Sequence, residues 1–138
     1  MVDRPKPFQY WTTAAQQPVR HPVPLVTEYV LNYDEETGNE TIIQTLHAGY
    51  KGDGSYGHDF TEEVYVLSGT AYCGTAKKWL KPGDYCCRTP GMVHGPFHCD
   101  EEFSALLINT RTYTGKPMVK DPPQWVYNTD DKKEEAKE

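Results

Sequence analysis

The sequence has no excess of basic residues and no long apolar run. Its 138 residues include 14 Lys and Arg against 20 Asp and Glu, which gives a formal net charge of −6. Binding to DNA or RNA needs clustered cations that neutralise phosphates, so nucleic acid is not an expected partner. No stretch approaches the ~18 apolar residues of a membrane span, and residues 1–7 lack the apolar segment of a secretory signal. We therefore expect a cytoplasmic protein without a membrane partner.

The chain also lacks the cysteine pattern of a disulfide scaffold or a zinc knuckle. Its four cysteines are Cys73, Cys86, Cys87 and Cys99, and no two of them form a Cys-x-x-Cys pair. Adjacent residues on a strand point to opposite faces, so Cys86 and Cys87 cannot act together there. We expect reduced thiols rather than a structural zinc site on cysteine.

No stretch shows the sustained three-to-four spacing of an amphipathic helix, and only residues 14–17 suggest a short helical turn. The chain instead contains short β-branched and aromatic runs separated by Gly, Pro, Asn and Asp, a pattern typical of a sandwich or barrel. We predict eight strands, at 25–33, 40–47, 63–67, 70–73, 77–80, 84–88, 94–98 and 102–111. The predicted fold class is all-β, a small antiparallel β-barrel, because a sheet that closes on itself leaves few open edges.

Length and composition predict one domain with two peripheral segments. A chain of 138 residues can bury one continuous core but not two. Proline punctuates the first 24 residues, and the end of the chain from Asp130 consists almost entirely of charged side chains. We predict an N-terminal arm at 1–24, a single barrel domain at 25–128 and a charged, disordered tail at 129–138.

The run from 54 to 97 holds the residues that suggest chemistry. His58, His94 and the adjacent carboxylates Glu62 and Glu63 lie on or next to predicted strands that are bounded by turns. Side chains alternate along a strand, so only one of the two carboxylates can enter the barrel. Two imidazoles and one carboxylate are the usual ligands of iron, manganese, nickel or zinc at an open site.

The spacing of these residues resembles the cupin superfamily over residues 40–111. In the first cupin motif, Gly is followed by five residues, His-x-His, three or four residues, Glu, six residues and Gly. Counting back from Gly69 places Glu62 at the glutamate and His58 at the second histidine, while Tyr56 fills the position of the first. The resemblance thus selects Glu62 rather than Glu63 as the inward carboxylate.

The second cupin motif consists of Gly, five residues, Pro-x-Gly, two residues, His, three residues and Asn. Gly83, Gly91 and His94 fall in register with this motif. Thr89 replaces the proline, and His98 stands where the asparagine would be. Three of the four metal positions of the family are therefore matched.

Within the superfamily, the chain resembles the cupin of ChrR-type anti-sigma factors and related stand-alone domains, where a Glu-Glu pair leads into a Val-Leu-x-Gly turn. The resemblance implies a cupin jelly roll, or double-stranded β-helix, that binds one divalent transition metal, Fe, Mn, Ni or Zn. Such domains include both sensors and enzymes, so the resemblance does not decide the activity.

Three further side chains have alternative roles. If Tyr56 faces inward, its phenol could ligate the metal, act as a catalytic acid or base, or only form a hydrogen bond. His47 is either a fourth metal ligand or a surface histidine, and His98 either packs outside the site or reaches the substrate as a catalytic proton carrier. Without Tyr56, the remaining two-histidine, one-carboxylate face leaves positions open on ferrous iron. A hydrogen-bonded cluster without metal is the structural alternative.

The aromatic residues suggest a cavity for a flat or partly apolar organic molecule with one or two chelating oxygens. Gln44, Arg88 and Phe97 are the candidate substrate contacts. We expect a metal-dependent enzyme for a small oxygenated substrate, foremost a dioxygenase. A redox-neutral isomerase, cyclase or lyase and a non-catalytic sensor or ligand-binding module are the alternatives. We also expect a homodimer, paired through sheet edges and the N-terminal arm.

Overall fold

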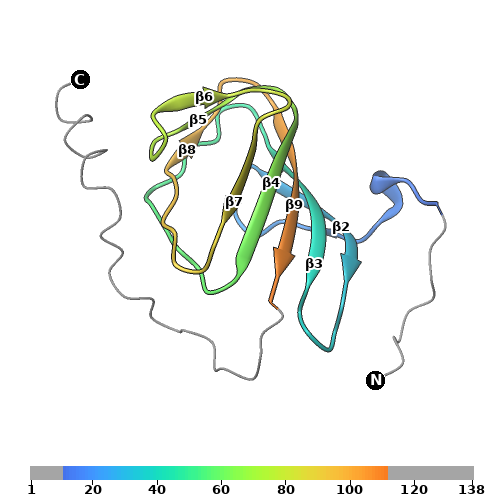
Figure 1. The fold of residues 1–138 in the computed structure, drawn as a ribbon. Helices are drawn as coiled ribbons and strands as arrows, with labels where there is room; N and C mark the ends of the chain where they lie inside the picture. The colour runs from blue at the N-terminus through green and yellow to red at the C-terminus, as the bar shows by residue number, and fades with distance from the viewer. Residues whose placement is uncertain (1–10, 112–138) are drawn as a thin grey trace.

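The computed structural model describes residues 11–111, which form an all-β fold with one short 3-10 turn, Ala14–Gln16 (Figure 1). Nine strands follow one another in this part of the chain. They are β1 Val19–Arg20, β2 Val26–Tyr33, β3 Glu40–Leu46, β4 Thr61–Ser68, β5 Ala71–Cys73, β6 Lys78–Leu80, β7 Tyr85–Arg88, β8 Phe97–His98 and β9 Phe103–Thr110. The predicted fold class is confirmed.

The strands form two antiparallel sheets. The larger has six strands in the order β1-β2-β3-β9-β4-β7, and the smaller has three in the order β6-β5-β8 (Figure 1). The neighbours β3 and β9, or β9 and β4, are far apart in sequence, as in a jelly roll. The core between the sheets includes Ile42, Val66, Ala71, Ala105 and Leu107, and alternate residues of each strand fill it.

The predicted strands agree closely with the observed ones, except that β1 was not predicted and that the strand expected at 94–98 is shorter. β8 contains only Phe97 and His98, because Pro96 has no amide hydrogen to donate and Gly95 adopts a positive φ of 96°. His94 instead pairs with Tyr56 through two main-chain hydrogen bonds of 2.9 and 3.0 Å. This pairing holds the loop before β4 against the loop after β7.

The N-terminal arm contributes a short strand. β1 pairs with β2, and the guanidinium of Arg20 binds the buried carboxylates of Glu28 and Glu40. The charged tail at 129–138 and the domain boundary at 128 lie outside the described residues. Residues 11–111 contain no helix that is long and apolar enough to cross a membrane.

Candidate metal centre

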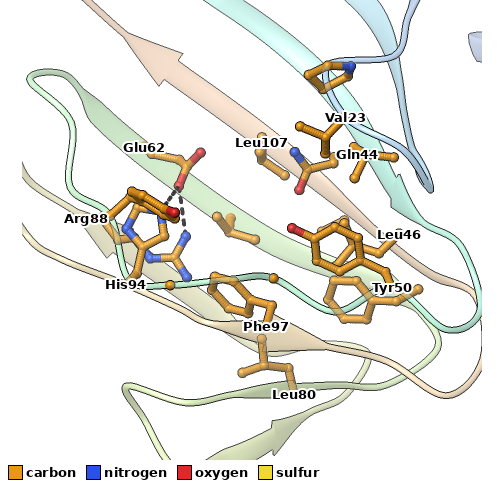
Figure 2. Close-up of a pocket in the computed structure, with 18 of the residues that line it drawn as sticks. Val23, Gln44, Leu46, Tyr50, Glu62, Leu80, Arg88, His94, Phe97 and Leu107 are labelled. Atoms are coloured by element: carbon orange, nitrogen blue, oxygen red, sulfur yellow. Dashed lines mark hydrogen bonds and ion pairs between the residues drawn. The ribbon is translucent and has the colours of Figure 1, made fainter.

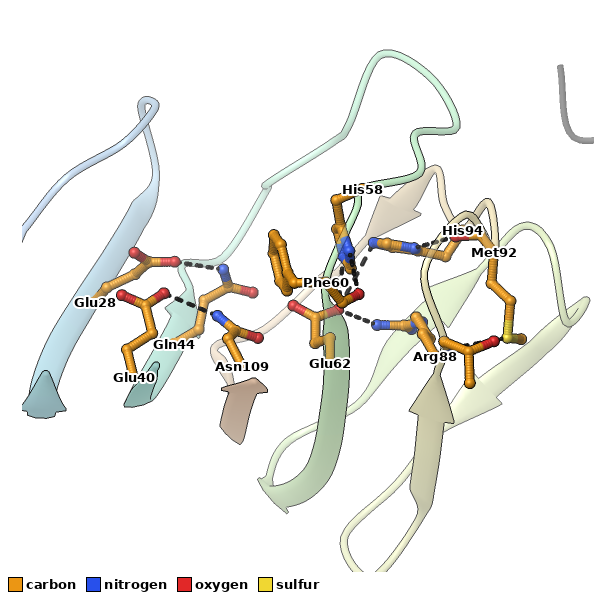
Figure 3. A network of polar contacts seen from close by, with 11 residues as sticks. Glu28, Glu40, Gln44, His58, Phe60, Glu62, Arg88, Met92, His94 and Asn109 are labelled. Carbon is orange, nitrogen blue, oxygen red and sulfur yellow. Dashed lines mark hydrogen bonds and ion pairs between the residues drawn. The ribbon is translucent and has the colours of Figure 1, made fainter. Parts of the chain in front are cut away.

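Three side chains converge at one end of the space between the sheets. Glu62 is the second residue of β4 and points inward, with Arg88 of β7 and Asn109 of β9 as its cross-strand neighbours. His58 approaches from the loop before β4, and His94 from the loop after β7. One ligand atom from each of His58, Glu62 and His94 lies within 4.8 Å of the others (Figure 3).

Main-chain carbonyls orient both imidazoles. Nδ1 of His58 lies 3.2 Å from the carbonyl oxygen of Phe60, and Nδ1 of His94 lies 3.3 Å from that of Met92. A carbonyl can only accept, so each Nδ1 carries the proton and each Nε2 keeps its lone pair. Both Nε2 atoms face Oε1 of Glu62, at 3.5 and 3.8 Å. This is the ring orientation that metal-binding histidines adopt.

The electrostatics hold Glu62 and His94 in their ligating protonation states. Burial alone would raise the pKa of Glu62, but the proximity of His58 and the charge of Arg88 lower it to about 2. The Arg88 guanidinium donates to Oε1 over 2.8 Å. Burial, together with the Arg88 charge, lowers the pKa of His94 to about 4. At neutral pH the carboxyl is therefore ionised and His94 is neutral, as metal binding requires.

The residues fit a divalent transition metal. Nε2 of His58 is buried without a hydrogen-bond partner, although a buried polar atom that lacks one costs about 1–3 kcal/mol. It lies near the Nε2 lone pair of His94 and an oxygen of Glu62. A bound cation would satisfy all three of these acceptors. A set of two nitrogens and one oxygen suits Fe, Mn, Ni or Zn.

A cavity of about 250 Å³ adjoins this cluster (Figure 2). Glu62 and His94 lie on one side of it, and Gln44 and Tyr50 on the opposite side. Val23 from the N-terminal arm adds to the wall. The other apolar lining residues include Val26, Leu46, Val64, Leu80, Phe97, Phe103 and Leu107.

The candidate substrate contacts Gln44, Arg88 and Phe97 all line the cavity. Gln44 donates from Nε2 to Oε2 of Glu28 over 2.8 Å, so its amide oxygen is the group left for a ligand. The Arg88 guanidinium is engaged with Glu62 and lies 5.4 Å from the ring centroid of Phe97. Arg88 therefore orients the carboxylate of Glu62.

Tyr56 lies at the edge of the cavity and is 60% exposed. Its hydroxyl donates to Oδ1 of Asp53 over 2.6 Å. This hydrogen bond and the carboxylate charge raise the pKa of Tyr56, so the phenol keeps its proton at neutral pH. A protonated phenol that donates to Asp53 does not fit the phenolate ligation of a metal.

The structure does not bring His47 or His98 into the cluster. His47 follows Leu46, which points into the core, and so it faces the other way; its Nε2 lies 2.7 Å from Oγ1 of Thr27. His98 follows the cavity residue Phe97 and likewise turns away, stacking on Tyr72 of the smaller sheet. Strand alternation explains both placements.

Sequence reasoning missed Tyr50 and Asp53, which line the cavity beside Tyr56. Both lie in the loop after β3, where the cupin motif specifies only a spacing. An aromatic and a carboxylate just before Tyr56 were the available signal. Sequence reasoning also missed that Arg88 is the ion-pair partner of Glu62. Arg88 lies opposite Glu62 in the β4–β7 register, and the sequence alone does not fix this register.

Residues 11–114 match the family model of the ChrR cupin-like domain. Among curated proteins, none matches the chain with significant similarity. The similar solved structures include an RmlC-like cupin from Shewanella frigidimarina, with 15% identity, a TM-score of 0.64 and coverage of 76% of this chain and 93% of that one.

Two further solved structures are similar. The polyketide cyclase RemF from Streptomyces resistomycificus has 15% identity and a TM-score of 0.63, covering 84% of this chain and 90% of that one. KdgF from Halomonas sp. has 13% identity and a TM-score of 0.62, covering 77% and 96%. At these identities the likeness establishes the fold alone.

Proposed function

Given that this chain belongs to the ChrR cupin-like domain family, we propose that it is a metal-dependent enzyme acting on a small oxygenated organic molecule, foremost a dioxygenase. The observation that carries the proposal is the unpartnered, buried Nε2 of His58, which faces the same carboxylate oxygen as Nε2 of His94 (Figure 3). His58, Glu62 and His94 would hold the metal, and three protein ligands leave positions open for other molecules.

When bound, ferrous iron would supply Lewis acidity and the capacity to react with dioxygen. The chain's own residues prepare the site. Arg88 fixes one oxygen of Glu62, and main-chain carbonyls fix both imidazoles. Phe97 and the other apolar walls reduce the access of water to the substrate. Tyr56, held by Asp53 with its proton in place, acts as an acid at the cavity edge.

The cavity supports a substrate class. Its size suits a single-ring or similarly flat molecule whose chelating oxygens face Glu62 and His94. At the opposite side, the amide oxygen of Gln44 accepts a hydrogen bond and the hydroxyl of Tyr50 can donate one. A partly apolar molecule with a hydrogen-bonding group opposite its chelating end would satisfy both sides.

The test uses full-length protein loaded anaerobically with ferrous iron, with 4-nitrocatechol and acetylacetone as chelating probes. We expect each probe to change the absorption spectrum of the loaded protein, and oxygen consumption to follow when air is admitted. His58→Gln should abolish both signals, whereas His47→Gln, which changes a histidine outside the cluster, should retain them. A loaded protein that binds neither probe would contradict the enzymatic proposal and favour a sensor.

A redox-neutral reaction is the second candidate, and the Tyr56–Asp53 pair favours it because proton transfer alone needs an acid of this kind. The fold likeness to a polyketide cyclase is compatible with this chemistry. Anaerobic loss of the enol absorption of acetylacetone with zinc, nickel or manganese protein would support this candidate. Turnover that requires both iron and dioxygen would exclude it.

A further inference from the structure

A second cavity lies between the two sheets, beside the hairpin of β5 and β6. Its wall includes residues of β6 and of β7, each of which stands at an end of its sheet in residues 11–111. Figure 1 shows the hairpin above β7. The volume of the second cavity is about 370 Å³, against about 250 Å³ for the metal cavity beside Glu62 and His94. The space between the sheets therefore has room for a molecule besides the one that the metal would bind.

The two cavities adjoin at the metal cluster. Four residues line both of them: Val64, Leu80, Arg88 and His94. Gln44 and Tyr50, which lie opposite the cluster, belong to the wall of the metal cavity alone. An occupant of the second cavity would therefore lie next to a metal ligand and away from the groups proposed to bind the far end of a substrate.

The wall of the second cavity is apolar and rich in sulfur. Its sulfur-bearing residues include Cys73 of β5, Cys86 of β7 and Met92 of the following loop. The apolar side chains around them are Val64, Val66, Ala76, Leu80 and Val93. Thioether sulfur is polarizable and contacts aromatic rings favourably, and a free cysteine behaves as a small apolar residue. Such a wall favours an aromatic occupant over an aliphatic one of the same size.

The polar side chains of this wall are engaged within the protein. Nζ of Lys78 lies 3.8 Å from Oδ2 of Asp84, and the hydroxyl of Thr75 donates to the carbonyl oxygen of Gly95 over 2.6 Å. Burial raises the pKa of Cys86, so its thiol is neutral at pH 7. A charged occupant would find no free counter-charge among these groups, and burying an unpaired charge is costly. The wall therefore suits a neutral molecule.

The size of the second cavity sets the size of its occupant. Ligand pockets in proteins begin at about 300 Å³, and an apolar cavity of only ~150 Å³ can already hold a benzene-sized molecule. A cavity of about 370 Å³ accommodates one or two rings. We propose that the second cavity is a separate binding site for a neutral aromatic molecule of one or two rings, which binds whether or not the metal is present.

Nuclear magnetic resonance on isotope-labelled, metal-free, full-length protein tests the proposal, with indole as the neutral aromatic probe. We expect saturable shifts of the amide signals of Cys73, Cys86 and Met92, with a dissociation constant below ~1 mM. The amide signals of Gln44 and Tyr50 should stay unchanged. Cyclooctanol, a neutral aliphatic ring of similar bulk, should bind at least ~5-fold more weakly, because it lacks the contacts between sulfur and an aromatic ring.

Two tryptophan variants form a matched pair. Cys86→Trp fills part of the second cavity and should raise the dissociation constant of indole at least ~10-fold. Leu67→Trp adds the same side chain on the neighbouring strand β4, where Leu67 is 44% exposed and lines neither cavity, and should change the constant less than ~2-fold. The shifts in the wild type locate the site without either variant, so the test does not depend on the folding of Cys86→Trp.

Any of four results would overturn the inference. Shifts at Gln44 and Tyr50 in place of Cys73 and Cys86 would assign indole to the metal cavity. The absence of saturable shifts at millimolar indole would show that the second cavity does not bind this class of molecule. Cyclooctanol that binds as tightly as indole would contradict an aromatic site. A folded Cys86→Trp variant with unchanged affinity for indole would place the occupant elsewhere.

Discussion

The pairing of Glu62 with Arg88 leads to a prediction that separates structural stabilisation from metal binding. Glu62→Gln retains the size of the side chain and one accepting oxygen but removes its charge. The variant leaves the guanidinium of Arg88, whose side chain is only 11% exposed, without a counter-ion. We expect a loss of stability in the metal-free protein and a loss of metal affinity, from two different causes.

The magnitude of the stability loss follows from the pKa of Glu62. Its displacement from 4.5 to about 2 means that the folded state favours the ionised carboxyl by about 3 kcal/mol. Removing one partner of a buried ion pair costs a similar amount, about 3–5 kcal/mol. Urea unfolding of metal-free protein at pH 7 should therefore show Glu62→Gln to be about 3 kcal/mol less stable than the wild type.

The double variant Glu62→Gln/Arg88→Met distinguishes the two roles. It removes both charges, so we expect at least ~2 kcal/mol of the stability to return. Its zinc affinity, measured by competition with a chromophoric chelator, should stay more than ~100-fold below that of the wild type, because a ligand is still missing. Arg88→Met alone should keep the zinc affinity within ~10-fold of the wild type, since all three ligands remain.

Two results would refute this reasoning. A Glu62→Gln protein as stable as the wild type would show that the ion pair contributes nothing to the fold. A double variant that regains stability and also binds zinc as tightly as the wild type would show that the metal does not need Glu62. The second result would leave the cluster as a structural hydrogen-bonded group.

Three further predictions concern the same region. The pKa of His94 falls from 6.5 to about 4 on folding, so the unfolded chain binds the proton first on acidification. Metal-free protein should therefore lose about 2–3 kcal/mol of stability between pH 6.5 and 4. In urea unfolding, His94→Gln should reduce this dependence of stability on pH. In the same competition assay, His58→Gln should lower zinc affinity more than ~100-fold, while His47→Gln should change it less than ~3-fold. Equal effects of the two variants would contradict the assigned ligand set. Arg20→Met should destabilise the chain by about 1–2 kcal/mol in thermal unfolding, since it leaves Glu28 without its ion-pair partner; an unchanged Tm would show that the ion pair does not stabilise the arm.

The sequence predicted most of the strands because each element carries a local signal. Alternation along β4 placed Glu62 and Val64 on one face, and turn residues such as Gly69 and Gly83, both at positive φ, marked the strand ends. The short β1 was not predicted, since two residues carry too little pattern. Its place is fixed instead by the long-range contacts of Arg20 with Glu28 and Glu40.

The residues of the ligand cluster were predictable because they stand at fixed spacings in the motifs. The side chains that surround the cluster were not predictable from the sequence. Whether Arg88 reaches the substrate or Glu62 depends on the β4–β7 register, a non-local property. The direction of His47 depends on where β3 ends relative to the core-facing Leu46. Such facts arise from the tertiary packing of strands distant in sequence.

The most direct test of the central claim is X-ray absorption spectroscopy on full-length protein carrying one equivalent of zinc. The account predicts a shell of nitrogen and oxygen ligands at ~2.0–2.2 Å, with the outer-shell scattering of two imidazoles from His58 and His94 and one carboxylate from Glu62. The imidazole signal should fall by half in His58→Gln. A shell containing sulfur at ~2.3 Å would place the metal on the cysteines and contradict the account.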